Sequence, residues 1–205
     1  MSCSLKAARY SNPLTLLPGN IPICQQIDLL LAENTNFHVA YFDLNFFKPF
    51  NDAFGYQKGD EVILCVADSI RQAVHPEKDF VGHVGGDDFI VIFQSSDVEN
   101  RCQLVLNLFA ERRMAFYSPQ QIQQGGITAQ NRQGEPQFFE LISLAIGVVH
   151  PDPFYCRTHH EVSSLAADAK HQAKQHGGNH LFISRRRKIT PALDHADMAI
   201  QPMAS

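Results

Sequence analysis

Residues 79–93 read DFVGHVGGDDFIVIF, and this stretch decides the fold and points to the chemistry. Two short apolar runs, residues 80–84 and 89–93, flank the sequence Gly-Gly-Asp-Asp. Because glycine adopts positive φ at little cost, the paired glycines predict a tight turn and therefore a β-hairpin. The turn carries two neighbouring carboxylates, Asp87 and Asp88, which repel each other unless a cation compensates their charge. Taken alone, a solvated turn is the simpler interpretation, since Gly and Asp are ordinary turn residues.

The composition of the whole chain predicts one soluble globular domain. Its 205 residues suit a single domain, and a hydrophobic content of 44% is enough for a full core. The formal net charge of −4 argues against a nucleic-acid-binding protein, which is usually basic. The five cysteines are odd in number and none forms a CxxC pair, so they predict reduced thiols in the cytoplasm and no zinc site. No apolar run approaches the roughly 20 residues of a membrane span, so no direct membrane contact is expected.

Hydrophobic periodicity predicts helices and strands in alternation along the chain. Residues 21–32 have apolar side chains at helical spacing, while residues 37–44, FHVAYFDL, are aromatic and β-branched and predict a central strand. A short helix and a loop are expected over residues 45–59, and Asp60 is expected to cap the next helix. The later predicted elements are a helix from an N-cap near Ser95 to about Tyr117, a connection with one short strand over 118–136, a long strand over 137–149, a helix over 161–174 and a strand over 180–183.

This order of elements predicts an α+β fold with one mostly antiparallel central sheet and helices on both faces. We expect one domain over residues 13–184, preceded by a lead-in over residues 1–12. Residues 185–205 contain the run RRRK and two prolines without periodicity, which predicts a disordered tail. A solvated tail is the simpler interpretation of the basic run; contact with an acidic partner or nucleic acid is the alternative.

A further carboxylate, Asp43, stands at the end of the strand predicted over residues 37–44. A carboxylate at the end of a buried strand is costly unless it is paired, hydrogen-bonded or bound to a metal. If this strand and the hairpin are neighbours in the sheet, Asp43 converges with Asp87 and Asp88 at one edge. Converging carboxylates suit Mg²⁺, which takes oxygen ligands and usually completes its shell with phosphates.

Three polar residues after this strand add groups that a nucleotide site needs. Lys48 can meet a phosphate as a point charge, while Asn51 and Asp60 offer an amide and a carboxylate that can read a base edge such as guanine. Each residue by itself has a simpler interpretation: Asn51 and Asp60 as helix caps, and Lys48 as a solvated side chain.

The sequence FDLNFFKPFNDAFGYQKGDEVI, followed by GGDDF, strongly resembles the GGDEF family of diguanylate cyclases. The segments PLTLLPGN, SLAIGVV and AKQHGGN resemble further blocks of that family in the same order, so the resemblance covers about residues 12–183. It implies a nucleotidyl-cyclase-like α+β fold. The sequence DFVGHVGGDDF around the hairpin most resembles GGDEF domains at the C-terminal end of larger signalling proteins that also carry EAL and CBS domains.

The resemblance also implies an activity. Such a domain binds one GTP with Mg²⁺ or Mn²⁺, and two domains meet face to face as a homodimer. Each 3′-hydroxyl attacks the α-phosphate of the other GTP, which gives cyclic di-GMP and pyrophosphate. Phosphoryl transfer of this kind needs positioning and charge neutralisation more than covalent chemistry.

Carried over by position, the family motifs imply roles for particular residues. Asp43, Asp87 and the Leu44 carbonyl are implied as metal ligands, and Asp88 and Lys174 as further catalytic residues, with Lys174 on the terminal phosphates. The residues implied for binding GTP are Phe46, Phe47 and Lys48 along the triphosphate, Asn51 and Asp60 at the guanine, and Gly85 and Gly86 at the α-phosphate.

Several positions depart from the family pattern. Asp88 stands for Glu and is shorter by one methylene, His83 and Gly178 stand for Arg, and Asn45 stands for an Asp that is not the principal metal ligand. Asp79 is the remnant of a product-inhibition motif whose Arg is absent, so we expect no tight feedback site for cyclic di-GMP.

The leading hypothesis is therefore a diguanylate cyclase. The alternative is a catalytically weak or inactive GTP-binding module that controls an attached EAL phosphodiesterase or output domain. EAL, CBS or sensor domains are possible partners within a full-length protein. A structural dimerisation domain without GTP binding is the least favoured, because the metal carboxylates and the base-reading residues are retained.

Overall fold

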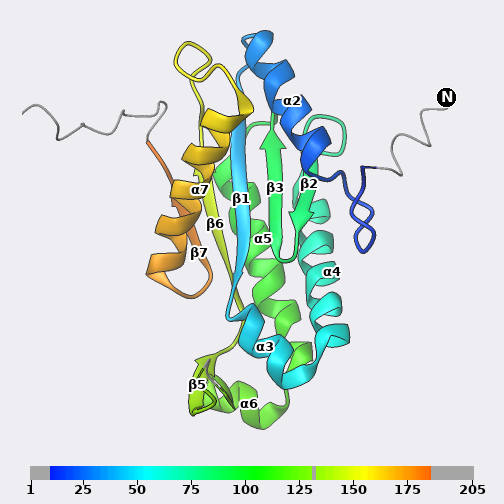
Figure 1. Ribbon diagram of the computed structural model, residues 1–205, viewed down its shortest axis with the longest axis vertical. Coiled ribbons are helices and arrows are strands. Elements are labelled where there is room, and N and C mark those ends of the chain that lie inside the picture. The colour runs from blue at the N-terminus through cyan, green and yellow to red at the C-terminus, as the bar shows by residue number, and fades with distance from the viewer. Residues whose placement is uncertain (1–9, 131–132, 186–205) are drawn as a thin grey trace, which may run out of the picture.

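The computed structural model describes residues 10–130 and 133–185, and its central feature is a five-stranded sheet (Figure 1). Its strands are, in spatial order, β2 (Phe80–Gly85), β3 (Asp88–Phe93), β1 (His38–Asn45), β6 (Ser143–Val149) and β7 (His180–Ile183). All neighbouring strands are antiparallel except β6 and β7, which are parallel. The predicted α+β fold with a mostly antiparallel sheet is thus confirmed. Apart from residues 10–12 and 185, the predicted lead-in and tail lie outside the described residues.

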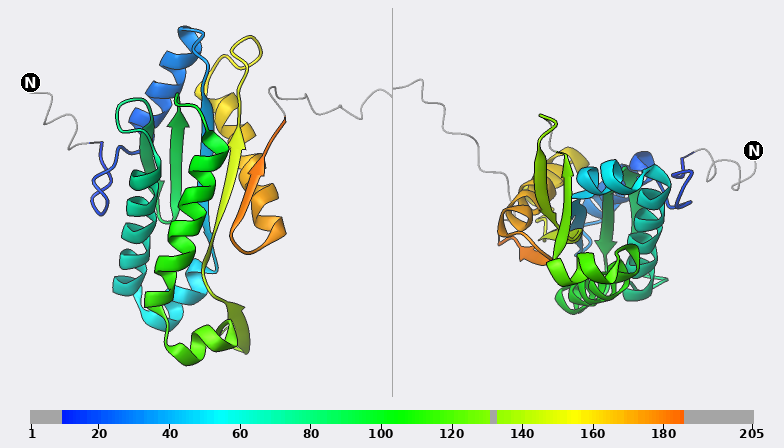
Figure 2. Two further views of the ribbon diagram at one scale, coloured as in Figure 1. Left: turned by 180° about the vertical axis from the view of Figure 1, so that it is seen from behind. Right: turned by 90° about the horizontal axis from the view of Figure 1, so that it is seen from below.

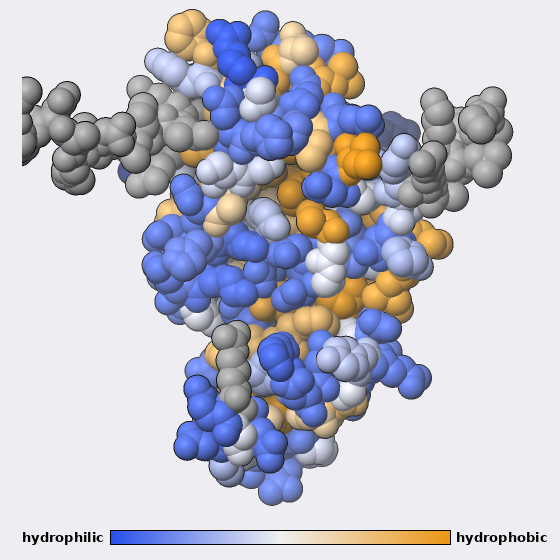
Figure 3. All heavy atoms as spheres, in the orientation of Figure 1, coloured by the Kyte–Doolittle hydropathy of each residue, from blue (hydrophilic) through white to orange (hydrophobic). Residues whose placement is uncertain are grey.

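Helices cover both faces of the sheet, as predicted (Figures 1 and 2). α2 (Asn20–Ala32) and α7 (His159–His176) lie on one face, and α4 (Tyr56–Ala73) and α5 (Val98–Arg112) lie on the other. The outer surface over α7 is mainly hydrophilic (Figure 3), as expected for a helix whose apolar stripe faces the sheet. None of the helices in the described ranges is long and apolar enough to span a membrane.

The alternation of side chains along β3 divides the interior into two cores. Ile90 and Ile92 pack with α2 and α7, while the alternate residues of β3 pack with α4 and α5, namely Phe89, Val91 and Phe93. This is the period of two that a strand covered on both faces requires. The apolar run after the Gly-Gly-Asp-Asp turn is therefore buried on both sides, which fixes the turn at the edge of a rigid sheet.

A smaller group of elements extends from one end of the sheet (Figure 1). It contains α3 (Phe47–Phe54), α6 (Pro119–Gln124) and a two-stranded sheet of β4 (Gly126–Gln130) and β5 (Pro136–Glu140). Only Phe46 separates the end of β1 from the start of α3, so this end of the molecule lies beside Asp43 near the end of that strand.

The single long strand predicted over residues 137–149 is wrong, because Leu141 and Ile142 separate β5 from β6. The Leu141 amide donates to the Gly125 carbonyl at 3.1 Å. The Ile142 amide donates to the Tyr117 hydroxyl at 2.9 Å. Because both amides donate to groups that are not in a neighbouring strand, the β-pairing is interrupted here. The chain leaves the small sheet and enters the central one.

Asp60 does not cap a helix as expected, because α4 begins four residues earlier at Tyr56. Gly55 precedes Tyr56 and has a φ of 87°. Since that backbone conformation suits glycine, the chain ends α3 and enters α4 with one intervening residue. The loop predicted before Asp60 is consequently the first turn of a helix.

α5 begins within the segment Ser95 to Glu99 predicted to hold its N-cap, but the Ser95 side chain does not cap it. α5 begins at Val98, and the Ser95 hydroxyl donates to Asp79 at 2.8 Å. The helix predicted to continue to about Tyr117 ends at Arg112 and is followed by a 3₁₀ turn, η1 (Arg113–Phe116).

The connection predicted over residues 118–136 contains the helix α6 as well as the expected strand. Ser118 and Gln121 form a capping box at its start, a sequence signal that the glutamine-rich composition hid.

Candidate active site

The acidic residues predicted to converge do lie together, at the edge where β1 ends and the hairpin turns. In the register of β1 and β3, Phe42 is opposite Phe89, so Asp43 follows Phe42 directly beside the turn. Asp43 is only 7% exposed, and its carboxylate is near enough to Asp87 to raise the pKa of that carboxyl. Three carboxylates, of Asp43, Asp87 and Asp88, therefore share one edge of the sheet.

The turn itself depends on its two glycines for backbone reasons. Gly85 has a φ of 149° and Gly86 a φ of 54°, conformations that side-chain-bearing residues rarely adopt. A Cβ added to either glycine would meet no protein atom within 4 Å, so the space above the turn is open. The conformation, rather than crowding within the protein, selects glycine here.

Two lysines of α7 contact these carboxylates. Lys174 Nζ lies 2.6 Å from Asp43 Oδ1 and 3.3 Å from the Leu44 carbonyl. Lys170 Nζ lies 3.0 Å from both Asp43 Oδ2 and Asp88 Oδ1. Sequence reasoning found Lys174 and missed Lys170. The available signal was the spacing of four residues, which puts both lysines on one side of a helix.

The electrostatics of the site are unbalanced at Asp87. Burial, followed by the neighbouring Asp43 carboxylate, raises the pKa of Asp87 to about 6. Burial alone would lower the pKa of Lys170, but its hydrogen bonds to Asp88 and Asp43 outweigh that effect and raise the pKa of Lys170 above its usual range. Lys170 is therefore a permanent cation, while Asp87 is the carboxylate that lacks positive charge nearby.

A cleft of about 490 Å³ opens beside the carboxylates. It is lined by residues of β1, α3, α4, the hairpin turn and α7, among them the predicted site residues Leu44, Phe46, Phe47, Lys48, Asn51, Asp87 and Lys174. Asp60 is exposed on α4 and is not among the lining residues.

The beginning of α3 presents backbone donors to this cleft. Phe46 has a φ of 61° and turns the chain into the helix. The amides of Phe47 and Lys48 fall in the first turn, where an α-helix offers no intrahelical acceptor, and a helix N-terminus favours anions. The Lys48 side chain is exposed and forms an ion pair with Asp52 at 2.7 Å.

Asn51 has an unused acceptor in this region. Its buried Oδ1 has no hydrogen-bond partner among the described residues. A Cβ on Gly59 would lie 1.9 Å from that oxygen, so the absence of a side chain at Gly59 makes room for the Asn51 amide. An unsatisfied buried acceptor is costly and is the kind of group that a ligand donor would satisfy.

The donor set fits a hard divalent cation. Asp43, Asp87 and the Leu44 carbonyl are oxygen ligands of the kind that Mg²⁺ and Mn²⁺ take. The Lys174 ammonium contacts both Asp43 and Leu44, which shows that these two oxygens already act together on a cation. No group of three or more His, Cys, Asp or Glu side chains suited to a metal occurs in the described part of the chain, so further ligands would have to come from phosphates or water.

The model of the family described as "Diguanylate cyclase, GGDEF domain" matches residues 11–180. The chain belongs to the GGDEF family of diguanylate cyclases. A diguanylate cyclase of Vibrio cholerae is 32% identical over 153 residues, which cover 70% of this chain and 39% of that protein. The bifunctional diguanylate cyclase/cyclic di-GMP phosphodiesterase MucR of Pseudomonas aeruginosa is 28% identical over 180 residues, which cover 85% of this chain and 23% of that protein. The chain thus spans well under half the length of these relatives.

Solved structures agree on the fold. The coiled coil and GGDEF domain of DgcB from Caulobacter crescentus, solved in complex with c-di-GMP, superposes with a TM-score of 0.65 at 22% identity and covers 88% of each chain. This likeness, at 22% identity, is to the GGDEF fold.

Two departures from the GGDEF pattern have structural roles. His83 is 2% exposed and lies beneath the turn, where its Nε2 donates to the Gly86 carbonyl at 2.9 Å and its Nδ1 accepts from the Thr15 hydroxyl at 2.9 Å. Its ring also stacks on Phe89 with 4.2 Å between centroids. The amide of Asn45 donates to Ser143 and to a backbone carbonyl after α7. Both residues support the frame of the site from inside.

Proposed function

We propose that this GGDEF domain condenses two molecules of GTP to cyclic di-GMP and pyrophosphate across a homodimer. The observation that carries the proposal is the meeting of Asp43, Asp87 and the Leu44 carbonyl with the start of α3 across one cleft. This is the combination that phosphoryl transfer needs: oxygen ligands for a divalent cation beside donors for the phosphates.

The triphosphate would lie along the first turn of α3. The amides of Phe47 and Lys48 offer hydrogen bonds, and the ammonium groups of Lys48 and Lys174 offer charge, with Lys174 toward the terminal phosphates. A Mg²⁺ or Mn²⁺ ion held by Asp43, Asp87 and the Leu44 carbonyl would neutralise the charge that develops on the phosphates. Gly85 and Gly86 leave open space for the α-phosphate.

The guanine would be read at the other end of the cleft. The unsatisfied Oδ1 of Asn51 supports this assignment, because an amide oxygen accepts from the N–H groups of a guanine edge. Asp60 lies one residue beyond Gly59, against which Asn51 packs. A small movement of the first turns of α4 would be required before both residues could contact one base.

Two half-sites follow from the stoichiometry. One cleft holds one GTP, and the product contains two guanylyl units, so the second GTP has to come from another copy of the domain. We infer that the domain spans residues 13–184 and acts in the cytoplasm as part of a longer protein, as its coverage of MucR suggests.

The test is a turnover assay with GTP and Mg²⁺ over a range of protein concentrations. The expected result is formation of cyclic di-GMP with second-order dependence on protein, and a loss on the order of 10²–10³-fold in Asp87→Ala. The matched control is Asp68→Ala, which removes an exposed carboxylate of α4 that contacts Arg71, and it should leave turnover unchanged.

Two outcomes would contradict the proposal. GTP binding without product at high protein concentration would identify the GTP-binding regulatory module instead, acting on an attached phosphodiesterase or output domain. No GTP binding at all would identify a structural domain.

A further inference from the structure

Lys170 reaches the carboxylates because α7 packs unusually close to the sheet at this position. A Cβ on Gly147 of β6 would lie 2.2 Å from the Lys170 amide nitrogen and 2.6 Å from its Cα. Gly147 is paired with Tyr41 of β1, and Lys170 Nζ lies 4.1 Å from the centre of the Tyr41 ring. The backbone contact at Gly147 thus sets how far the Lys170 side chain extends across β1.

The Lys170 ammonium is held on three sides. It bridges Asp43 Oδ2 and Asp88 Oδ1, both at 3.0 Å, and the face of the Tyr41 ring completes its surroundings. Its side chain is 19% exposed and does not line the cleft. Displacing it would leave a largely buried ammonium and the Asp88 carboxylate without ion-pair partners, while Asp43 would keep only Lys174, which is strongly unfavourable.

Lys174 is in a different position, although it contacts the same aspartate. Its side chain is 36% exposed and lines the cleft, and its ammonium contacts the two oxygens implied as metal ligands, Asp43 Oδ1 and the Leu44 carbonyl. A long lysine side chain at the mouth of a cleft can exchange a carboxylate for a phosphate at little cost in packing.

We propose that Lys170 is a fixed counter-cation of the carboxylate cluster: it occupies Asp88 and one oxygen of Asp43, so that the site accepts one divalent cation and Asp88 is not one of its ligands. Lys174 is the exchangeable cation, which leaves Asp43 when the metal binds. This inference rests on the proposed metal site, and it concerns how many ions that site takes and which carboxylates hold them.

The balance of charge supports this division of roles. The three carboxylates carry three negative charges, and the two lysines carry two positive ones. Asp88 and one oxygen of Asp43 are neutralised by Lys170, whereas Asp87 has no ion pair among the described residues. A divalent cation is therefore drawn to the side of Asp87 and Leu44, and the region around Asp88 offers no further negative charge.

The experiment is titration of the nucleotide-free protein with Mn²⁺, followed by the electron paramagnetic resonance signal of the free ion. The wild-type protein should bind one Mn²⁺. Lys170→Met should bind a second ion, or bind the first about tenfold more tightly, because it releases Asp88 and one oxygen of Asp43. Lys170→Arg should keep one ion, since the charge remains, and so should the matched control Lys78→Met at an exposed lysine before β2.

A second pair of variants tests Asp88 directly and does not depend on a buried lysine. Asp88→Asn should leave Mn²⁺ affinity within about twofold of wild type, whereas Asp43→Asn should weaken it by about tenfold or more. Adding Asp88→Asn to Lys170→Met should abolish the second ion. Circular dichroism of each variant establishes that it is folded.

Clear results would overturn the proposal. Weakening by Asp88→Asn equal to that by Asp43→Asn would make Asp88 a ligand. A wild-type stoichiometry of two, or unchanged binding in folded Lys170→Met, would remove the role of Lys170. These results are independent of turnover, so a domain that binds one Mn²⁺ and produces no cyclic di-GMP would contradict the proposed activity and leave this inference standing.

Discussion

The two ends of the β2–β3 hairpin each hold an aspartate, and the two carboxylates have opposite surroundings. Asp79, just before β2, accepts hydrogen bonds from the amides of His75, Gln94 and Ser95 and from the Ser95 hydroxyl, at 2.8 to 3.1 Å. Asp87, in the turn at the other end, lies beside the Asp43 carboxylate, and its pKa is raised to about 6. Hydrogen-bond donors of the protein already satisfy the Asp79 carboxylate. The Asp87 carboxylate has no positively charged partner among the described residues.

This difference separates an acid with a structural role, Asp79, from the acid proposed to bind the metal, Asp87. Four donors hold Asp79 in place and tie the start of β2 to the end of β3, so its charge is already compensated. Asp87 has no ion pair among the described residues, so in the proposed function its charge would be compensated by the bound cation. Asp79, which the resemblance implies as the remnant of a product-inhibition motif, thus ties β2 to the end of β3 by hydrogen bonds in this chain.

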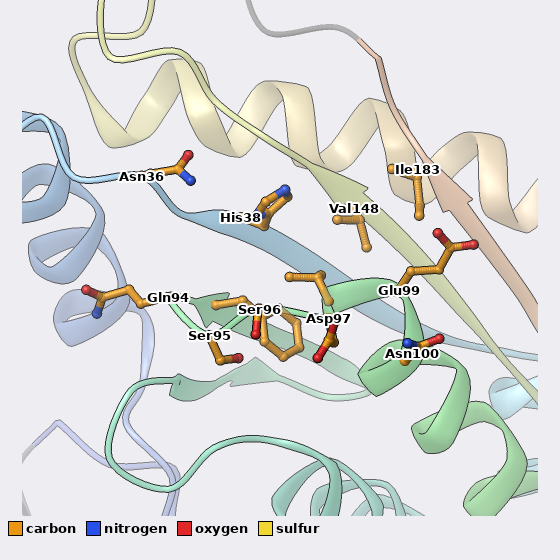
Figure 4. Close-up of a pocket in the computed structure, with 12 residues that line it drawn as sticks. Asn36, His38, Gln94, Ser95, Ser96, Asp97, Glu99, Asn100, Val148 and Ile183 are labelled. Carbon is orange, nitrogen blue, oxygen red and sulfur yellow. The ribbon is translucent and has the colours of Figure 1, made fainter.

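The volumes of the hollows at the two ends of the hairpin do not distinguish the structural aspartate from the one proposed to bind a metal. A hollow of about 640 Å³ lies at the Asp79 end, between the start of β1, the end of β3 and the N-terminus of α5 (Figure 4). Its labelled side chains, such as Gln94, Ser96 and Glu99, come from a loop and a helix end. The cleft beside Asp87 is smaller, at about 490 Å³, but its lining includes two lysines and two carboxylates, those of Lys48, Lys174, Asp52 and Asp87.

The largest effect on stability is expected from removing the hydrogen bonds that Asp79 accepts. Asp79→Ala should lower the free energy of unfolding by about 3 kcal/mol, because several amides lose a charged acceptor together. Urea denaturation monitored by circular dichroism measures this loss. Turnover per folded molecule should persist; a loss of turnover with unchanged stability would show that the comparison assigns Asp79 wrongly.

A somewhat smaller loss is expected from Gly147→Ala. The added methyl group would collide with the backbone of α7 at Lys170, and relieving that overlap should cost about 2 kcal/mol. The change should also withdraw Lys170 from Asp88, so Mn²⁺ affinity should rise alongside the fall in urea midpoint. Ala145→Gly on the same strand is the control for altered strand propensity, since it adds no atom.

At the turn, the effect on stability should have the opposite sign. The pKa of Asp87 is raised in the folded state, so its ionisation costs stability as the pH rises from 3.8 through about 6. Asp87→Asn should therefore stabilise the metal-free protein at pH 7, by about 1 kcal/mol once solvent screening is allowed for. Equal stability of the two proteins at pH 7 would argue against the crowding of Asp87 by Asp43.

His83 connects the turn to the interior and should make stability depend on pH. Burial lowers the pKa of His83 below its ordinary value of 6.5. The unfolded chain then binds a proton that the folded chain resists, so stability should decline as the pH falls below 6.5. The decline should be smaller in His83→Gln, and the comparison of urea midpoints between pH 5 and pH 8 isolates the contribution of this histidine from that of the other nine.

The smallest effect is expected at the mouth of the cleft. Lys48 and Asp52 are exposed and four residues apart on α3, and such pairs contribute about 0.3–0.5 kcal/mol. Asp52→Ala should therefore change stability by no more than that amount. Because it frees the Lys48 ammonium, GTP affinity measured at low salt should rise slightly; a loss of affinity would mean that Asp52 itself contacts the nucleotide.

Much of the frame was predictable because it depends on local patterns. The apolar run of residues 89–93, the helical spacing of Ile23 and Ile27 in α2 and the glycines of the turn are each read over a few residues, and each was confirmed. The predictions were wrong where residues distant in the sequence determine the local structure. Leu141 and Ile142 have the composition of a strand, but Gly125 and Tyr117 take their amides.

The sequence by itself determined that a tight glycine turn carries two acids, that Asp43 ends a buried strand, and that the chain has the ordered motifs of a GGDEF domain. Only the tertiary structure decided what surrounds each acid. Lys170 contacts Asp88 from 82 positions away, and His83 reaches Thr15 across 68. Charge compensation depends on distances of about 3 Å in space. A pattern along the chain specifies which residues are charged, and only the packing of α7 on the sheet specifies which charges meet.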